Sequence, residues 1–311
     1  MKHNTKITVI LLVMFILAQL IGLYVVNFYM DENNKLPYGF DENQAIQKDN
    51  SFYTQFLISL VFSFVVAIAI VFFLIKVKSN YIIKIWFFGV TCIALGITLT
   101  IASKKLGIIY PSYIALAVGV VLAYFKIFRR NIIIHNITEL LIYPGIAALF
   151  VLMLNLPTCI ILLILISIYD IWAVWKSGIM QKMASFQINN VGVFGGFFLP
   201  YAGRKMKEKI NLLKEKYNNK IPMKIAKKHG LKINLAILGG GDIIFPIIAA
   251  GVFLKTFSSI YASLIVILFA TLGLLYIFLF GKKKKPYPAM PYLTAGLLIG
   301  MAVARLLLVY L

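Results

Sequence analysis

Three acidic side chains lie within long apolar stretches of the sequence, and they are the residues whose types and positions could do chemistry. They are Glu139, Asp170 and Asp242, in a chain that holds only ten aspartates and glutamates. An ionisable group in the middle of a bilayer costs about 2.5–3.5 kcal/mol on insertion scales, so it is rare unless it has a use. For the two aspartates a functional use is favoured over a carboxyl that joins helices. For Glu139 the joining role is favoured, with His135 and Arg130 as candidate partners.

Two carboxyl groups about 3 Å apart cannot both ionise, so a pair such as Asp170 and Asp242 would share one proton. The ionised member can accept a proton from a trapped water, while the neutral member donates a hydrogen bond to a peptide carbonyl. Water then attacks that carbonyl, and a proton passes to the leaving nitrogen. The pattern predicts an aspartyl protease that needs no metal ion and no other cofactor. The HExxH motif of zinc proteases does not occur in the sequence.

The segments around these acids predict an all-α, polytopic membrane protein. Hydrophobic residues make up 61% of the chain, against about 45–50% in typical globular proteins. An apolar run of about 20 residues can cross a bilayer as a helix, and the first such run is too long for a signal peptide. We place nine transmembrane helices at 7–28, 52–75, 81–102, 107–125, 134–154, 157–175, 233–254, 258–280 and 289–310.

The distribution of lysine and arginine predicts the orientation in the membrane. The net charge of +21 does not indicate nucleic-acid binding, because the basic residues gather between the predicted spans. With a cytoplasmic N-terminus, 25 of the 31 basic residues lie inside and five outside. Basic residues are enriched on the cytoplasmic side of membrane proteins. We therefore expect an integral protein of the cell membrane with its N-terminus in the cytoplasm and its C-terminus outside.

This arrangement predicts that the two aspartates lie at similar depths. Asp170 lies about five residues, or roughly 8 Å, from the inner end of the sixth span, at 1.5 Å per residue. Asp242 lies about nine residues, or roughly 14 Å, into the seventh span from the same side. Because consecutive spans joined by an inner loop run antiparallel, the two carboxyls can face each other nearer the cytoplasm.

The residues beside both acids have distinctive types. Asp170 follows Tyr169, and Asp242 follows the three glycines 239–241. Glycine has no Cβ and lets another backbone approach, as a bound peptide would need; ordinary glycine-rich helix packing is the alternative. Pro246 lacks an N–H, so it leaves the Asp242 carbonyl without its helical hydrogen bond.

A third element opens the last predicted span. Three prolines lie between residues 286 and 291, and they favour extended or polyproline backbone over a regular helix start. Free backbone groups there could hold an extended substrate. A plain helix entry with proline in the first turn is equally well supported.

Taken together, these three elements resemble the presenilin and signal peptide peptidase family of GxGD intramembrane aspartyl proteases. The family has nine spans, with a Tyr-Asp motif in the sixth, a Gly-x-Gly-Asp motif in the seventh and a Pro-Ala-Leu motif at the ninth. This sequence is similar, with Met290 in place of leucine, which keeps the size and apolarity. The resemblance implies that Asp170 and Asp242 are the catalytic pair. It also implies that the remaining motif residues shape the site or hold substrate: Tyr169, Gly239, Gly241, Pro288, Ala289 and Met290.

The resemblance further implies transmembrane peptides or proteins as substrates. The small size and short loops look like those of archaeal and other microbial members, which implies that no auxiliary subunit is required. The predicted orientation is that of the presenilin branch, because signal peptide peptidases are inverted.

The long loop divides the chain into a six-span part, 1–175, a basic cytoplasmic loop, 176–232, and a three-span part, 233–311. Within the loop, the apolar and glycine-rich stretch 186–201 is expected to lie on the membrane or to reach the active site. The basic stretch 204–232 fits an amphipathic helix on anionic lipid and a solvated linker equally well.

Two other functions stay open on these residues. One is a proton- or ion-coupled transporter or channel that uses Asp170 and Asp242 as relay acids, although we find no inverted repeat of broken helices. The other is a prepilin-type peptidase, which shares the GxGD chemistry but should lack the Tyr-Asp and Pro-Ala-Leu elements.

Overall fold

The structure is a computed structural model that describes residues 5–31, 34–40, 50–77, 80–129, 131–178, 180, 183, 186–187, 192–201, 234–281 and 287–310. These residues form nine α-helices, a short π-helical segment and one two-stranded sheet. Eight of the helices are long and apolar enough to cross a membrane, and α2 adds a shorter apolar stretch. The predicted helical membrane fold is therefore confirmed. The elements are α1 Thr5–Met30, α2 Asn50–Val77, α3 Asn80–Lys105, α4 Pro111–Phe128, α5 Ile132–Met153, α6 Leu156–Ile171, η2 Trp172–Lys176, β1 Gly196–Tyr201, β2 Asn234–Gly239, α10 Gly240–Phe257, α11 Ile260–Phe280 and α12 Met290–Tyr310.

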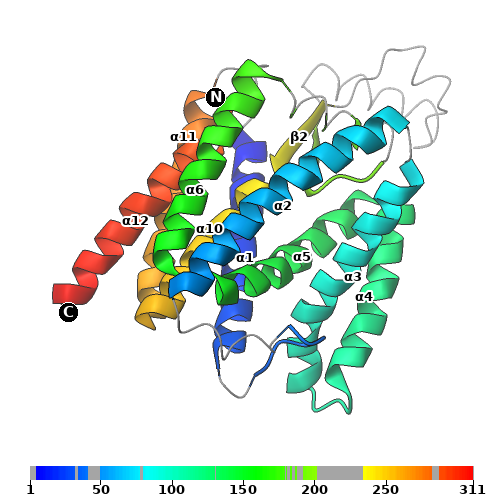
Figure 1. Ribbon diagram of the computed structural model, residues 1–311, viewed down its shortest axis with the longest axis horizontal. Helices are drawn as coiled ribbons and strands as arrows, with labels where there is room; N and C mark the ends of the chain where they lie inside the picture. The colour runs from blue at the N-terminus through cyan, green and yellow to red at the C-terminus, as the bar shows by residue number, and fades with distance from the viewer. Residues whose placement is uncertain are drawn as a thin grey trace.

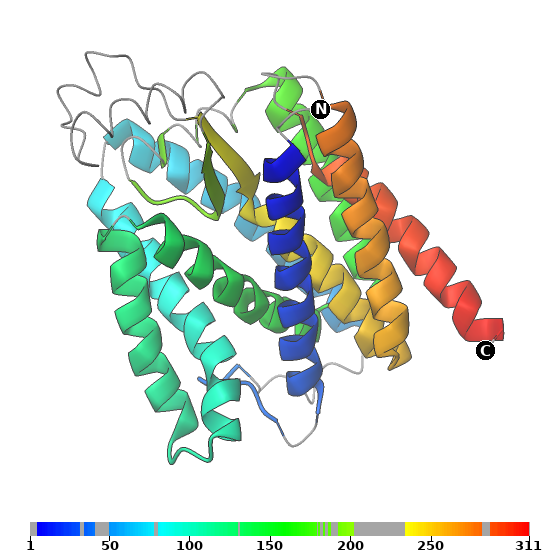
Figure 2. The same ribbon diagram turned by 180° about the vertical axis from the view of Figure 1, so that it is seen from behind.

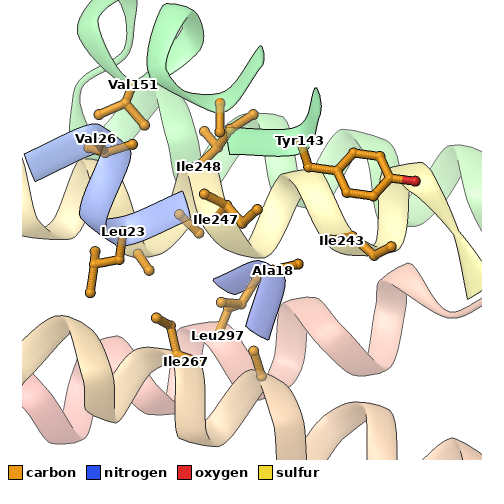
Figure 3. Close-up of a cluster of buried hydrophobic side chains, with 14 of the residues drawn as sticks. Ala18, Leu23, Val26, Tyr143, Val151, Ile243, Ile247, Ile248, Ile267 and Leu297 are labelled. Atoms are coloured by element: carbon orange, nitrogen blue, oxygen red, sulfur yellow. The ribbon is translucent and has the colours of Figure 1, made fainter. Parts of the chain in front are cut away.

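Helix α1 lies in the middle of the bundle and contacts α5, α10 and α11 (Figure 2). Helices α3 and α4 pack as a pair on one side, and α11 and α12 pack as a pair on the other (Figure 1). Figure 3 shows the core where α1, α5 and α10 meet α11 and α12, with Ala18, Ile247 and Leu297 among the buried side chains. The two ends of the described chain lie at opposite ends of the bundle.

Local sequence explains the start of one helix and the close approach of two others. Helix α4 begins at Pro111, four residues later than predicted, because Tyr110 adopts a left-handed conformation with φ 59° and Pro111 fits the first turn. Helix α5 runs through Pro144, and Gly145 beside it lies against the Ala94 carbonyl on α3. A Cβ on Gly145 would lie 2.1 Å from that carbonyl oxygen, so only glycine allows the two helices to approach this closely.

The predicted N-terminal part of the seventh span is wrong. Residues 234–239 form strand β2, which pairs antiparallel with β1 in a register that joins Gly196 to Gly239. Side chains alternate along the strand, with Ala236 and Leu238 buried and Leu235 and Ile237 exposed. A short apolar run cannot be assigned to helix or strand by periodicity alone, and its partner strand lies in the loop on the far side of residues 202–233. Helix α10 therefore begins only at Gly240.

The sheet also shows where part of the apolar stretch 186–201 lies. Strand β1 packs against α5 and α10, so this part of 186–201 reaches the interior of the protein. The amphipathic stretch predicted for 204–232 lies outside the described residues. Cys92 and Cys159 are buried free thiols.

Candidate active site

Asp170 lies next to the last residue of α6 and is 6% exposed. Its Oδ2 atom accepts a hydrogen bond of 3.0 Å from the backbone N–H of Met290. Met290 is the first residue of α12, where backbone N–H groups have no partner within the helix and the helix dipole favours an anion. The start of α12 thus donates a backbone N–H to this carboxyl.

A side-chain contact holds α6 and α12 in register around Asp170. The Ser167 hydroxyl lies 2.7 Å from the Thr294 hydroxyl. Ser167 lies one turn before Asp170, and Thr294 lies one turn after Met290. Both side chains are buried, and their contact sets the position of α6 relative to α12 along the helix axes.

Asp242 is the third residue of α10 and is partly buried. Its Oδ2 atom lies 3.2 Å from the position that a Cβ on Gly239 would occupy, so the carboxyl turns back over the start of its own helix. A carboxylate in the first turn interacts favourably with the helix dipole. Asp242 was predicted to lie about nine residues inside a long helix. It lies instead in the first turn of α10, directly after β2.

The first turn of α10 is held by its neighbours. The Gly240 N–H donates to the Gly195 carbonyl at 3.1 Å. The buried Gln19 amide of α1 donates to the Ile243 carbonyl at 3.0 Å. This bond lies next to the turn that Pro246 leaves without an N–H donor.

An apolar cavity of about 460 Å³ opens between α2, α5, α6 and α10. Tyr169 and Gly241 both line it, and each is the sequence neighbour of one of the two aspartates. The Tyr169 ring meets Phe64 of α2 edge to face at 5.3 Å. The cavity therefore borders both of the segments that carry the aspartates. Its walls carry mostly aliphatic and aromatic side chains, including Leu60, Val61, Leu162, Ile244 and Phe245.

The remaining predicted residues lie as follows. Pro288 is buried and Ala289 partly buried in the non-helical residues before α12, and Gly239 is the last residue of β2. Sequence reasoning missed Gln19 and the Ser167–Thr294 contact, since a single polar residue in an apolar helix gives no sign of its partner.

Glu139 joins helices, as favoured from the sequence. Its Oε1 atom forms an ion pair with Lys126 of α4, and His135 Nε2 lies 3.6 Å away. The candidate partner Arg130 lies outside the described residues. Lys126 was missed because it was counted with the inner loop, whereas it is a buried residue of α4.

The family comparison covers almost the whole chain. The profile of a family described as "Signal-peptide peptidase, presenilin aspartyl protease" matches residues 10–309. The chain belongs to this family. It is thus an intramembrane aspartyl protease, an integral multi-pass membrane protein that acts on protein substrates, and the transporter and prepilin-peptidase alternatives are rejected.

Solved structures agree with this fold. A presenilin family intramembrane aspartate protease has been solved in two crystal forms that resemble this protein. The match to one form has a TM-score of 0.57 and 16% sequence identity, and it covers 96% of this chain and 99% of the chain in that structure. The other has a TM-score of 0.56 and 17% identity and covers 96% of both chains. No significant match was found among curated protein sequences.

Proposed function

We propose that Asp170 and Asp242 are the catalytic pair of this protease. The observation that carries the proposal is the meeting of three motifs that are far apart in the sequence. The start of α12 donates its Met290 amide to Asp170, and the neighbours of both aspartates line one cavity. Helix α6, which carries Asp170, packs against both α10 and α12.

In the proposed reaction, the pair shares one proton. The ionised carboxylate takes a proton from a water molecule as the water oxygen attacks the scissile carbonyl carbon. The protonated carboxyl transfers its proton to the carbonyl oxygen, which gives a tetrahedral diol. The C–N bond then breaks as the carboxyl protonated by water gives its proton to the nitrogen and the other carboxylate takes a proton from the diol. The products are a carboxylic acid and an amine, and the pair again holds one proton. The titration belongs to the pair and not to either residue alone.

The apolar cavity supports transmembrane segments as substrates. Its lining offers almost no polar group, so an apolar segment from the bilayer fits it better than a charged soluble peptide. Val61→Trp on α2 would fill part of the cavity. We expect this substitution to raise KM for a transmembrane peptide without changing the melting temperature, and an unchanged KM would argue against this route.

The orientation and partners are part of the proposal. The excess of basic residues between the helices on one side supports a cytoplasmic N-terminus and an outer C-terminus in the cell membrane. The division into a six-span part, a loop and a three-span part stays a prediction. We also propose that the chain cleaves substrates without an auxiliary subunit.

The test is cleavage of a model transmembrane peptide by the purified full chain in detergent. Asp170→Asn and Asp242→Asn should each lower kcat/KM by at least about 10³-fold, as expected for residues that act as one unit. Asp31→Asn, in the residues after α1, is the matched control and should cleave normally. Normal cleavage by either of the first two variants would show that the assignment is wrong.

A further inference from the structure

We propose that α5 carries a docking site for β1, formed by His135, Asn136 and Glu139, and that this docking positions Asp242 for catalysis. These are positioning residues, because they contact the sheet and not the reacting atoms. The inference rests on the proposed role of Asp242. It gives a function to Glu139, the intramembrane acid that the catalytic pair does not use.

Asn136 binds the backbone of β1 in the way that a neighbouring strand would. Its Nδ2 donates to the Phe198 carbonyl at 2.8 Å, and its Oδ1 accepts from the Phe198 N–H at 2.9 Å. The side chain thus satisfies both polar groups of a residue on the edge of β1 that β2 does not use. A helix side chain that pairs both groups of one residue fixes the strand along its length and in its rotation.

His135 holds the next part of the same edge. Its Nε2 lies 2.8 Å from the Gly196 carbonyl, so the ring donates a hydrogen bond there. The ring also stacks on Phe198 with centroids 4.8 Å apart and planes 26° apart. His135 therefore contacts β1 through both a hydrogen bond and an aromatic ring.

Glu139 contributes a buried charge that is paired on several sides. It is 1% exposed, contacts Lys126 of α4, and lies 3.5 Å from the Gly196 N–H. Removing one partner of a buried ion pair is strongly destabilising, because the other charge is left unpaired. The ion pair thus ties α4, α5 and the first residue of β1 together.

The docked strand leads directly to Asp242. Gly196 pairs with Gly239, and the Gly195 carbonyl accepts from the Gly240 N–H, two residues before Asp242. Gly196 has φ +154°, and a Cβ there would lie 2.5 Å from the Leu238 carbonyl oxygen. Only glycine therefore allows β1 to approach β2 this closely at residue 196.

Tyr143 completes the connection one turn along α5 from Glu139. Its buried ring meets Phe197 of β1 edge to face at 5.6 Å. A Cβ on Gly240 would lie 3.2 Å from the ring. Figure 3 shows this ring beside Ile243 at the start of α10. Helix α5 therefore contacts both the strand and the turn that carries Asp242.

Asn136→Leu tests the proposal, because it keeps the side-chain size and removes both hydrogen bonds to Phe198. A displacement of Asp242 by about 1 Å should cost on the order of 10–100-fold in rate. We expect kcat to fall by that factor while KM for a transmembrane peptide stays within about twofold. If Asp242 moves away from Asp170, the bell-shaped pH profile should also narrow, because coupling between the two carboxyls weakens.

The matched control is Asn155→Leu. Asn155 also makes side-chain hydrogen bonds, but it caps α6 at the opposite end of α5. It should lower the melting temperature and leave kcat and the width of the pH profile unchanged. His135→Phe is the second test variant, because it keeps the stacking on Phe198 and loses the bond to Gly196, and it serves if Asn136→Leu does not fold.

The proposal is overturned if the folded test variants keep wild-type kcat. It is also overturned if their kcat falls no further than that of Asn155→Leu at equal melting temperature, with an unchanged pH profile. Asp242→Asn, measured in the same assay, distinguishes failure of the proposed catalytic pair from failure of the docking proposal. If Asp242→Asn is active, the proposed catalytic pair fails, whereas an inactive Asp242→Asn with fully active docking variants removes only the docking role.

Discussion

At the scale of single residues, the three glycines before Asp242 differ in what surrounds them. A Cβ on Gly240 would lie 3.2 Å from the Tyr143 ring and 3.3 Å from the Gly195 carbonyl oxygen. A Cβ on Gly241 would meet only Phe245, at an ordinary 3.7 Å. The variable position of the Gly-x-Gly-Asp motif is thus the more crowded one in this protein.

We therefore predict opposite effects of alanine at the two positions on stability. Gly240→Ala should lower the free energy of unfolding by about 1–3 kcal/mol, because a packed core must yield to the added methyl group. Gly241→Ala should be neutral or stabilising by up to about 1 kcal/mol, because alanine restricts the unfolded chain and favours the helix. Thermal unfolding in detergent measures both, and equal destabilisation would contradict the account.

At the scale of elements, the site depends on helix ends held in register. The Ser167–Thr294 contact lies one turn from the point where the Met290 amide reaches Asp170. Both hydroxyls also lie close to the Leu163 carbonyl, at 2.8 Å for Ser167 and 3.4 Å for Thr294. Hydrogen bonds between membrane helices contribute about 0.6 kcal/mol on average, so this contact matters through position more than through stability.

Ser167→Ala, Thr294→Val and the double variant form a cycle that tests this register. We expect each single variant to lose about 0.5–1.5 kcal/mol, with a coupling of about 0.5–1 kcal/mol, because the residues share one interaction. Cleavage activity should fall in both single variants. Thr271→Val is the control, since its hydroxyl donates to the Ile267 carbonyl of its own helix at 2.8 Å. Additive losses with full activity would show that the contact does not hold the site.

The sequence predicted the elements better than their junctions. Long apolar runs locate the helices because spanning a bilayer requires about 20 residues, and Tyr169-Asp170 and the glycines before Asp242 identified the region of the site. Strand β2 was not predicted, because the apolar run 235–238 fits a helix and a strand equally well. The catalytic roles of the two aspartates stay predictions.

Contacts between distant residues were also beyond the sequence. Lys126 lies next to basic loop residues and has the type expected of a solvated charge, yet it is buried against Glu139. The Met290 N–H is a backbone group, and residue type does not reveal which carboxyl it will meet. Such partners are fixed by packing in three dimensions and leave no periodic pattern.

At the scale of the whole molecule, the described residues form nine α-helices, and an odd number of helices can connect opposite ends of a bundle. The described chain begins at one end of the bundle and finishes at the other (Figure 1). Strands β1 and β2 lie at the same end of the bundle as the start of α1 (Figure 1), and the sequence segment 176–232 holds thirteen basic residues. This arrangement agrees with the proposed cytoplasmic N-terminus.

Cysteine labelling in membrane vesicles tests the orientation. In a background with Cys92 and Cys159 replaced by alanine, Thr5→Cys should react with an impermeant thiol reagent only in inside-out vesicles. Val309→Cys, which is exposed near the end of α12, should react only in right-side-out vesicles. Labelling of both from the same side would contradict the topology, and the reversed pattern would place the N-terminus outside.

The most direct measurement of the central claim is cleavage by Asp170→Asn, Asp242→Asn and the double variant, compared in one assay. Two carboxyls that act as a single proton-sharing unit predict that each single variant loses nearly all activity and that the double variant is no worse than either one. Independent losses that multiply in the double variant, or wild-type cleavage by either single variant, would contradict the account.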